Sequence, residues 1–106
     1  MIAAEAEVEK PVRTRPLVSA QSKPYLPHYV RLQLDRLRDR YVVLAPERVF
    51  WPDGVAVDII ALCDGRRTVS QIAEQLANDY AAPRETIETD VLEFVQSWTD
   101  IRLLRL

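Results

Sequence analysis

The sequence predicts a small α+β domain: a three-stranded antiparallel meander followed by a three-helix bundle, shaped like a winged helix-turn-helix. Three observations support this prediction. Short apolar runs separated by tight turns fill residues 29–52, the apolar spacing changes to a helical period after Asp53, and turn signals divide the helical region into three. With 106 residues, the chain is large enough for one hydrophobic core and too short for two domains of ordinary size.

Three strands are expected before the helices. Residues 30–34 alternate between apolar and polar side chains, which is typical of a half-buried strand. Residues 41–45 are apolar on both faces and rich in residues that favour strands, as in a central strand. A tight turn at Pro46 leads into a third strand over residues 48–51, which Pro52 ends. Short connections give antiparallel neighbours, so the strand order is expected to follow the chain.

Each of the first two helices has a start signal. Asp53 is suited to cap a helix over residues 54–63, and Gly65 stops that helix because glycine adopts the left-handed conformation at low cost. Thr68 and Gln71 form a capping box, in which each side chain accepts a backbone N–H of the other residue. Behind this box, apolar residues at helical spacing predict the second helix.

The ends of the chain have weaker signals. A third helix is expected from Pro83 to about Trp98, because proline is favoured at the first helical position. Residues 101–106 are expected to form a short strand or arm. Residues 1–28 contain four of the seven prolines and no apolar periodicity. We therefore expect a flexible tail or interdomain linker over residues 1–28 and an ordered domain over residues 29–106.

Charge is distributed unevenly along the chain. Residues 29–52 carry a net charge of +2, and residues 53–106 carry a net charge of −5. Between residues 70 and 100 there are seven acidic residues and one basic residue, Arg84. A nucleic-acid duplex would be repelled by this segment, since its phosphates require a basic surface. A winged-helix nucleic-acid-binding regulator therefore remains only an alternative interpretation.

Residues suited to catalysis or metal binding are scarce. His28 is the only histidine, and Cys63, the only cysteine, lies on the apolar side of its helix, where a buried thiol is the commonest case. Two glycines cannot supply a phosphate-binding loop. We expect no catalytic residue, no metal site and no cofactor. Three glutamates among the first ten residues argue against a secretory signal, and no uncharged apolar run approaches the ~20 residues that span a bilayer. A cytoplasmic protein away from the membrane is therefore expected. We also expect a monomer.

The third strand lacks the usual protection of a sheet edge. Natural edges carry charge or proline, whereas Val49, Phe50 and Trp51 place apolar groups on both faces. One interpretation is that one face packs on the helices and the other meets residues 101–106. The other is a docking edge to which an extended peptide adds as a fourth strand, with the third helix as a facing wall. The residues expected to bind the peptide are Arg48, Val49, Phe50, Trp51, Val91, Leu92 and Val95.

The chain resembles the PqqD family of pyrroloquinoline quinone (PQQ) biosynthesis at residues 62–72, Leu-Cys-Asp-Gly-Arg-Arg-Thr-Val-Ser-Gln-Ile. The family pattern is an apolar helix, then Leu-Cys-Asp-Gly-x-Arg-Thr-Val, then an isoleucine three residues on, and each fixed position is matched. The order of strands and helices also fits, so the resemblance covers about residues 29–106. One departure is Pro52-Asp53, where many relatives carry Leu-Asn.

The resemblance implies a peptide chaperone without catalytic activity, of the type called a recognition element for ribosomally made, modified peptides (RiPPs). Such a domain holds a precursor peptide against its third strand and third helix. In this family the precursor is PqqA, and the receiving enzyme is PqqE, a radical S-adenosylmethionine (SAM) protein that cross-links a glutamate and a tyrosine of the peptide. The iron–sulfur clusters and SAM would belong to that enzyme. Some relatives are fused behind PqqC, which is consistent with residues 1–28 as a linker.

Overall fold

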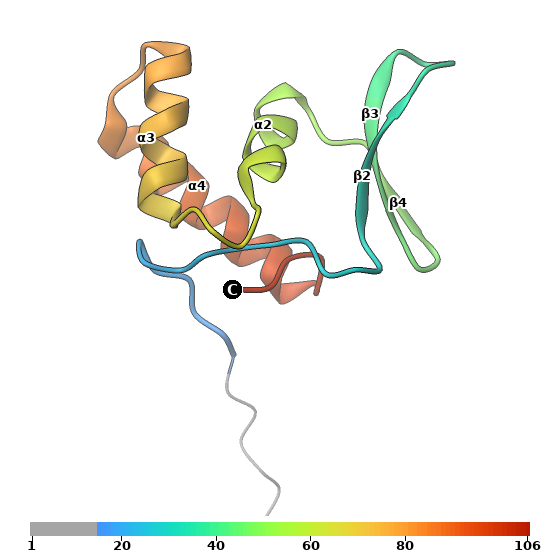
Figure 1. Cartoon of the computed structure of the whole chain (residues 1–106), viewed down its shortest axis with the longest axis horizontal. Coiled ribbons are helices and arrows are strands. Elements are labelled where there is room, and N and C mark those ends of the chain that lie inside the picture. The colour runs from blue at the N-terminus through green and yellow to red at the C-terminus, as the bar shows by residue number, and fades with distance from the viewer. Residues whose placement is uncertain (1–14) are drawn as a thin grey trace, which may run out of the picture.

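The computed structural model describes residues 15–106. Its elements in chain order are β2 (Arg31–Asp35), β3 (Arg40–Ala45), β4 (Arg48–Phe50), α2 (Gly54–Leu62), α3 (Val69–Tyr80) and α4 (Arg84–Asp100). The strands form one antiparallel sheet in the order β2-β3-β4. Figure 1 shows the sheet at one side of the molecule and α3 at the other, with α2 between them. The predicted order of three strands and then three helices is confirmed.

The sheet has one face in the core and one face outside it. Val43 of β3 is fully buried, and its partners across the sheet, Leu32 of β2 and Phe50 of β4, pack in the same cluster. Side chains alternate along a strand, so Val42 and Leu44 point to the opposite face. A depression on that face is lined entirely by the sheet, the β2–β3 turn and the residue after β4. β3 lies between β2 and β4, so the expected central strand is confirmed.

Two helices begin as the sequence predicts. At the start of α2, Asp53 Oδ1 accepts the N–H of Ala56 at 2.8 Å. At the start of α3, the Gln71 N–H donates to Thr68 Oγ1 at 3.1 Å, and the Thr68 N–H donates to Gln71 Oε1 at 2.9 Å. These bonds satisfy amides that have no acceptor within the helix. The third helix begins one residue later than expected, after Pro83.

The buried side chains form two clusters that meet. The larger joins the three helices and consists of Ile59, Cys63, Val69, Ile72, Ala73, Leu76, Val91, Val95 and Leu104. The smaller joins the sheet to α2 and consists of Val30, Val43, Ile60 and Leu103. Because Leu26, Phe94 and Trp98 contact both clusters, the sheet and the helices share one core. Within residues 15–106, no helix has both the length and the apolar content that crossing a bilayer requires.

Residues 15–28, the N-terminal arm, pack against the helices. The C=O of Ser22 accepts the N–H of Val69 at 2.9 Å, and the C=O of Ala20 accepts the N–H of Ser70 at 3.0 Å. These N–H groups are the first two of α3, which have no acceptor within the helix. The arm therefore completes the hydrogen bonding at the start of α3.

The prolines that suggested flexibility take part in this packing. Pro24 is fully buried, and its C=O accepts the N–H of Gly65 at 2.9 Å. Since proline has no N–H, its burial leaves no donor unsatisfied. The predicted tail is therefore wrong for residues 15–28, and its remaining part, residues 1–14, lies outside the described residues.

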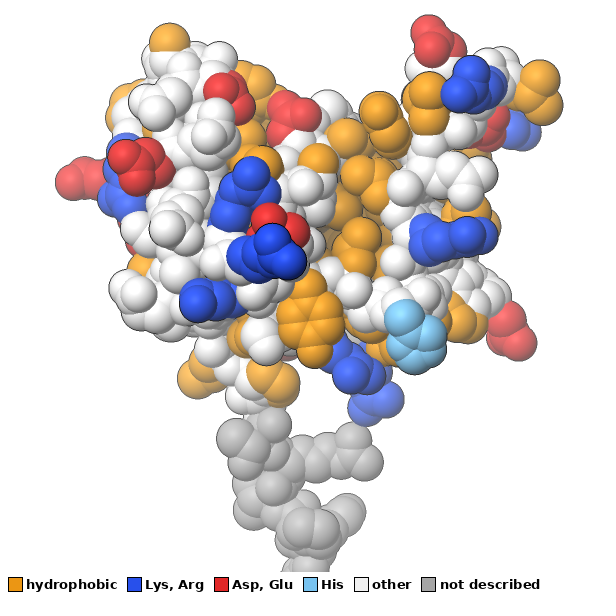
Figure 2. Space-filling model, in the orientation of Figure 1, with side chains coloured by type: hydrophobic (Ala, Val, Ile, Leu, Met, Phe, Trp, Pro, Cys, Tyr) orange, Lys and Arg blue, Asp and Glu red, His pale blue; other side chains and the backbone are white. Residues whose placement is uncertain are grey.

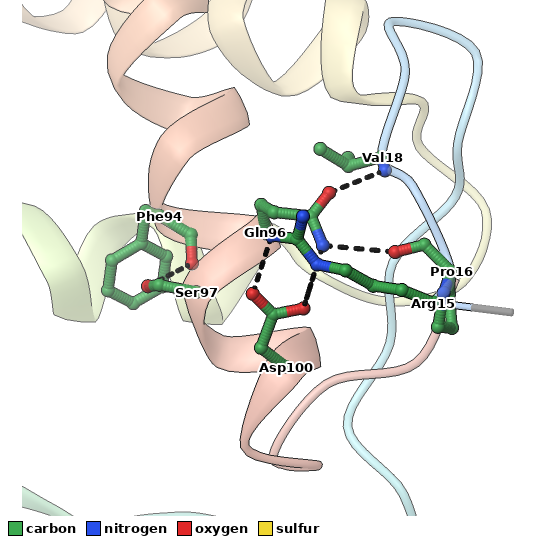
Figure 3. Close-up of polar contacts among 7 residues, drawn as sticks. All are labelled: Arg15, Pro16, Val18, Phe94, Gln96, Ser97 and Asp100. Atoms are coloured by element: carbon green, nitrogen blue, oxygen red, sulfur yellow. Dashed lines mark hydrogen bonds and ion pairs between the residues drawn. The ribbon is translucent and has the colours of Figure 1, made fainter. Parts of the chain in front are cut away.

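Polar contacts fix the start of the arm to α4 (Figure 3). Gln96 Oε1 accepts the N–H of Val18 at 2.9 Å, and Gln96 Nε2 donates to the C=O of Pro16 at 3.0 Å. Arg15 donates to both carboxylate oxygens of Asp100, at 2.9 and 2.7 Å. The hydrogen bond from Arg15 holds the pKa of Asp100 below its ordinary value. The arm and the last turn of α4 are thus joined at several points.

Residues 101–106 form a second short arm rather than a full strand. Arg105 and Tyr25 pair in a single antiparallel bridge. Leu103 and Leu104 are fully buried in the two clusters described above. Because these leucines lie on the core side of the sheet, this segment leaves the outer face uncovered, contrary to one of the two interpretations of the third strand.

Candidate functional site

The free edge of β4 is the candidate functional site. β4 pairs with β3 on one side, and no segment of residues 15–106 pairs with its other side. The β3–β4 turn has two residues, so Ala45 and Arg48 are the hydrogen-bonded pair that closes the hairpin. Pairs alternate along antiparallel strands, so Val49 directs its N–H and C=O away from β3. This edge therefore offers one donor and one acceptor to an added strand.

Apolar side chains lie along the same edge. Val49 is 56% exposed and Trp51 is 39% exposed. Both point to the outer face of the sheet, because they alternate with Phe50, whose side chain packs in the core. An unpaired backbone beside exposed apolar side chains is suited to strand addition, in which the backbone fixes the register and the side chains provide selectivity.

Aromatic contacts link β4 to α4. The ring centroids of Phe50 and Trp98 are 5.7 Å apart, and Phe94 stacks on Trp98 at 4.9 Å. Phe94 and Trp98 are four residues apart on α4, so they share one face of the helix. All three rings are half-buried. The side of α4 that faces β4 is therefore aromatic.

Arg48 connects the edge to the end of α4. Its Nη1 donates to the C=O of Ile101, the residue after the helix, at 3.0 Å. Its guanidinium also lies 5.9 Å from the ring of Phe50. Carbonyl groups at a helix C-terminus have no partner within the helix and attract cations. Arg48 thus ties β4 to this end of α4.

The helix residues predicted from the sequence do not face β4. Val91 and Val95 are 1% and 0% exposed and belong to the core between the helices. Leu92 is half-buried and lines a shallow pocket together with Val18 of the N-terminal arm. The structure therefore keeps the predicted residues 48–51, in and directly after β4, together but separates them from the three predicted on α4.

Phe94 and Trp98 are the site residues that sequence reasoning missed. Both belong to the apolar stripe of the third helix, and the spacing of four residues places two aromatic rings on one side of that stripe. This aromatic pair is the signal in the sequence that could have indicated Phe94 and Trp98. The pair alone does not show which side of the stripe faces the sheet, because that depends on how the helix is rotated in the fold.

A second apolar region lies between α2 and the strands, and Figure 2 shows hydrophobic side chains gathered in that hollow. Tyr41, Val57 and Tyr80 are among the residues that line a pocket of about 370 Å³ there. The hydroxyl of Tyr80 donates to Asp58, and this hydrogen bond raises the pKa of Tyr80. The pocket lining contains neither cysteine nor histidine, so it does not suggest nucleophilic chemistry.

Cys63 is also unsuited to nucleophilic chemistry. Its side chain is 6% exposed, and Sγ donates to the C=O of Ile59 at 3.2 Å. Burial, with the charge of Asp64 as a second cause, raises the pKa of the thiol to about 12. His28 lies exposed in the N-terminal arm. In the part of the chain that the structure describes, no three histidine, cysteine or acidic side chains come together to hold a metal ion.

Residues 40–104 match the family described as "Coenzyme PQQ synthesis protein D (PqqD)". A "PqqA binding protein" of Bradyrhizobium diazoefficiens is 48% identical over 83 residues, which cover 78% of this chain and 81% of the relative. A protein of the same name from Xanthomonas axonopodis is 44% identical over 89 residues, covering 84% of this chain and 97% of the relative.

Two solved structures are also similar. The solution NMR structure of the PqqD truncation of Methylobacterium extorquens PqqCD, described as a functional, stand-alone RiPP recognition element, has a TM-score of 0.73 at 43% identity. It covers 84% of this chain and 95% of that chain. The crystal structure of PqqD from Xanthomonas campestris has a TM-score of 0.54 at 45% identity and covers 84% of this chain and 99% of that one.

Proposed function

This chain belongs to the PqqD family, and on that basis we propose that it binds the ribosomal precursor peptide PqqA by strand addition at the edge of β4. The observation that carries this proposal is the unpaired outer edge of β4, where Val49 directs its N–H and C=O outward beside exposed apolar side chains. The names of the relatives, which are PqqA binding proteins, support the identity of the peptide.

The peptide site in this proposal has an edge and a wall. Arg48, Val49, Phe50 and Trp51 form the edge, as expected from the sequence. The wall is the aromatic side of α4, represented by Trp98, because Trp98 already contacts Phe50. In this proposal the predicted helix residues do not contact the peptide. They pack α4 against the other helices and so hold Trp98 in place: Val91, Leu92 and Val95.

In this proposal the domain is a cytoplasmic chaperone that presents PqqA to the radical SAM enzyme PqqE. Holding a flexible peptide beside the enzyme makes their encounter nearly intramolecular, which raises the effective concentration of the substrate. Ordering the peptide costs conformational entropy, which limits the affinity per area of contact. The chemistry itself belongs to the enzyme. Association with PqqC is a related proposal, supported by the relative that is part of PqqCD.

An NMR titration of the amide-labelled chain with PqqA tests this function. We expect chemical shift changes concentrated on residues 48–51 and on the side of α4 that carries Trp98. A DNA duplex serves as the control, because the acidic segment from residue 70 to 100 is expected to repel it. Shifts confined to surfaces away from β4 would contradict strand addition, and a response to DNA without a response to PqqA would contradict the function.

A further inference from the structure

The outer face of the sheet, defined by Val42, Leu44, Val49 and Trp51, carries these apolar side chains beside the polar residues Arg31, Gln33 and Asp35 of β2. No helix of residues 15–106 lines the depression on this face. An antiparallel sheet with one solvated face usually carries polar residues on that face. Here β3 places the buried Val42 and the half-buried Leu44 there, at the base of a depression of about 520 Å³, and the exposed apolar surface comes from Val49 and Trp51. An apolar surface of this kind marks an interaction site.

Leu37 extends this outer face at the turn between β2 and β3. Its side chain is 95% exposed, and it lines the same depression as Trp51. The turn is nevertheless fixed, because Asp35 Oδ1 accepts the N–H groups of Leu37 at 3.0 Å and Arg38 at 3.2 Å. A leucine held in this way contributes little to folding stability, which depends on burying apolar surface. Contact with a partner would bury it.

Arginine side chains surround the outer face. The guanidinium groups of Arg38 and Arg40 lie 5.4 and 5.1 Å from the ring of Trp51. Asp35 forms an ion pair with Arg38 at 2.9 Å. Arg31, in β2, lies on the same face by the alternation of the strand. Among the described residues, Arg31 and Arg40 form no ion pair, so the rim of this face keeps a positive charge.

The chemistry of this face defines its occupant. A complementary surface needs apolar side chains at its centre and carboxylates around them. A second copy in a symmetric dimer would place the same arginines against one another, which is unfavourable. An extended peptide pairs with the edge of a sheet rather than with its face. A folded protein with an apolar, acidic patch satisfies both requirements.

We propose that the outer face docks the enzyme that modifies the peptide, through an apolar and acidic patch of that enzyme. This inference rests on the proposed function, in which peptide and enzyme are held at the same time. Val49 joins the two surfaces, since its backbone lies on the edge and its side chain lies on the outer face. Peptide on the edge and enzyme on the face are therefore neighbours that meet at the side chains of Val49 and Trp51.

The test measures binding of the full chain to the purified radical SAM enzyme and, separately, to PqqA, by isothermal titration calorimetry. The altered chain carries Leu37→Asp and Arg31→Glu, two exposed positions on the outer face and away from the β4 edge. The matched control carries Leu17→Asp and Arg66→Glu, which make the same changes at exposed positions elsewhere. We expect enzyme affinity to fall at least tenfold in the altered chain and to stay within twofold in the control, with PqqA affinity unchanged in both.

Four other outcomes would overturn the inference, and each can be told apart from a failure of PqqA binding. Unchanged enzyme affinity in the altered chain would show that the enzyme docks elsewhere, while PqqA binding would still stand. If the unaltered chain does not bind the enzyme, both the proposed docking face and the proposed presentation of the peptide are wrong. In sedimentation, a dimer of the unaltered chain that the outer-face substitutions dissociate would identify a second copy as the occupant. Amide shifts on the outer face when residues 1–14 are removed would identify this chain's own terminal segment instead.

Discussion

Tyr25 and Arg105 exchange two backbone hydrogen bonds, 2.8 and 2.9 Å long, and so join the N-terminal arm to the end of the chain. The N-terminal arm also supplies acceptors to the first two amides of α3. The N-terminal arm, which is paired with the end of the chain, therefore completes a helix start in the middle of the sequence. The packed domain therefore includes residues that lie before the region matched by the family, residues 40–104.

We expect chain 29–106 to be much less stable than chain 15–106, because it lacks residues 15–28. The truncation at residue 29 loses the backbone hydrogen bonds to α3, Gly65 and Arg105 and uncovers apolar surface. At about 1 kcal/mol net for each of several bonds, the loss is about 3 kcal/mol or more in the free energy of unfolding. Urea unfolding of chains 15–106 and 29–106, compared with the full chain, measures it. Equal midpoints for the full chain and chain 29–106 would refute this role of the arm.

Val49→Pro should weaken binding of PqqA about tenfold or more without unfolding the domain. Proline removes the outward N–H of the edge, and its ring obstructs an approaching strand. The β3–β4 ladder is kept, because the Val49 N–H does not take part in it. Fluorescence anisotropy with labelled PqqA gives the affinity, and circular dichroism checks the fold.

Val49→Thr is the matched control for this change. Threonine keeps the backbone N–H and the β-branched shape, so PqqA affinity should stay within about threefold of the unaltered chain. If Val49→Pro and Val49→Thr bind PqqA equally well, backbone pairing at this edge does not hold the peptide.

Asp64→Asn should lower the melting temperature at pH 7 but not in strong acid. The backbone N–H of Arg67 and then that of Arg66 hold the pKa of Asp64 below its ordinary value. A carboxyl group with a lowered pKa contributes stability that is fully present above its unfolded pKa of about 3.9 and is lost as the pH falls through its folded pKa.

The difference in melting temperature between Asp64→Asn and the unaltered chain should therefore be largest at neutral pH and shrink as the pH falls through the lowered pKa of Asp64. Calorimetric scans between pH 2 and pH 7 follow it. Glu74→Gln, an exposed change on α3, is the control, and its difference should stay small throughout. A difference for Asp64→Asn that persists at pH 2 would mean that the ionised carboxylate is not its source.

Cys63 should resist alkylation in the folded protein. Its pKa of about 12 leaves almost no thiolate at pH 8, and burial blocks access of the reagent. Mass spectrometry after treatment with iodoacetamide should show labelling only in the presence of denaturant. Rapid labelling of the native chain at pH 8 would contradict the placement of this thiol.

The sequence predicted the elements well because their signals are local. The capping box of Thr68 and Gln71 and the cap at Asp53 involve residues three apart, and both occur as expected. The packing of the N-terminal arm was not predicted, because its signals are not local. Its partners, such as Gln96, lie far away in the chain, and proline content alone does not reveal tertiary contacts.

The candidate site was predicted in part for the same reason. The unprotected edge at Val49 is visible in the sequence, because edge protection depends on the residues of the strand itself. The choice of Val91 and Val95 as a facing wall did not take into account how α4 is rotated about its axis. The structure turns Trp98 toward β4 and places both valines between the helices.

The short length of β4 sets a limit on how tightly its backbone can hold a peptide. Three residues leave one outward N–H and one outward C=O, so an added strand gains two backbone hydrogen bonds there. At about 0.5–1.5 kcal/mol net for each, backbone pairing alone falls short of a millimolar dissociation constant. Side-chain contacts must supply the remaining binding free energy. Loss of a few of these contacts therefore raises the dissociation rate of the peptide. The proposed peptide complex is therefore expected to be readily reversible, since few contacts have to break before the peptide leaves.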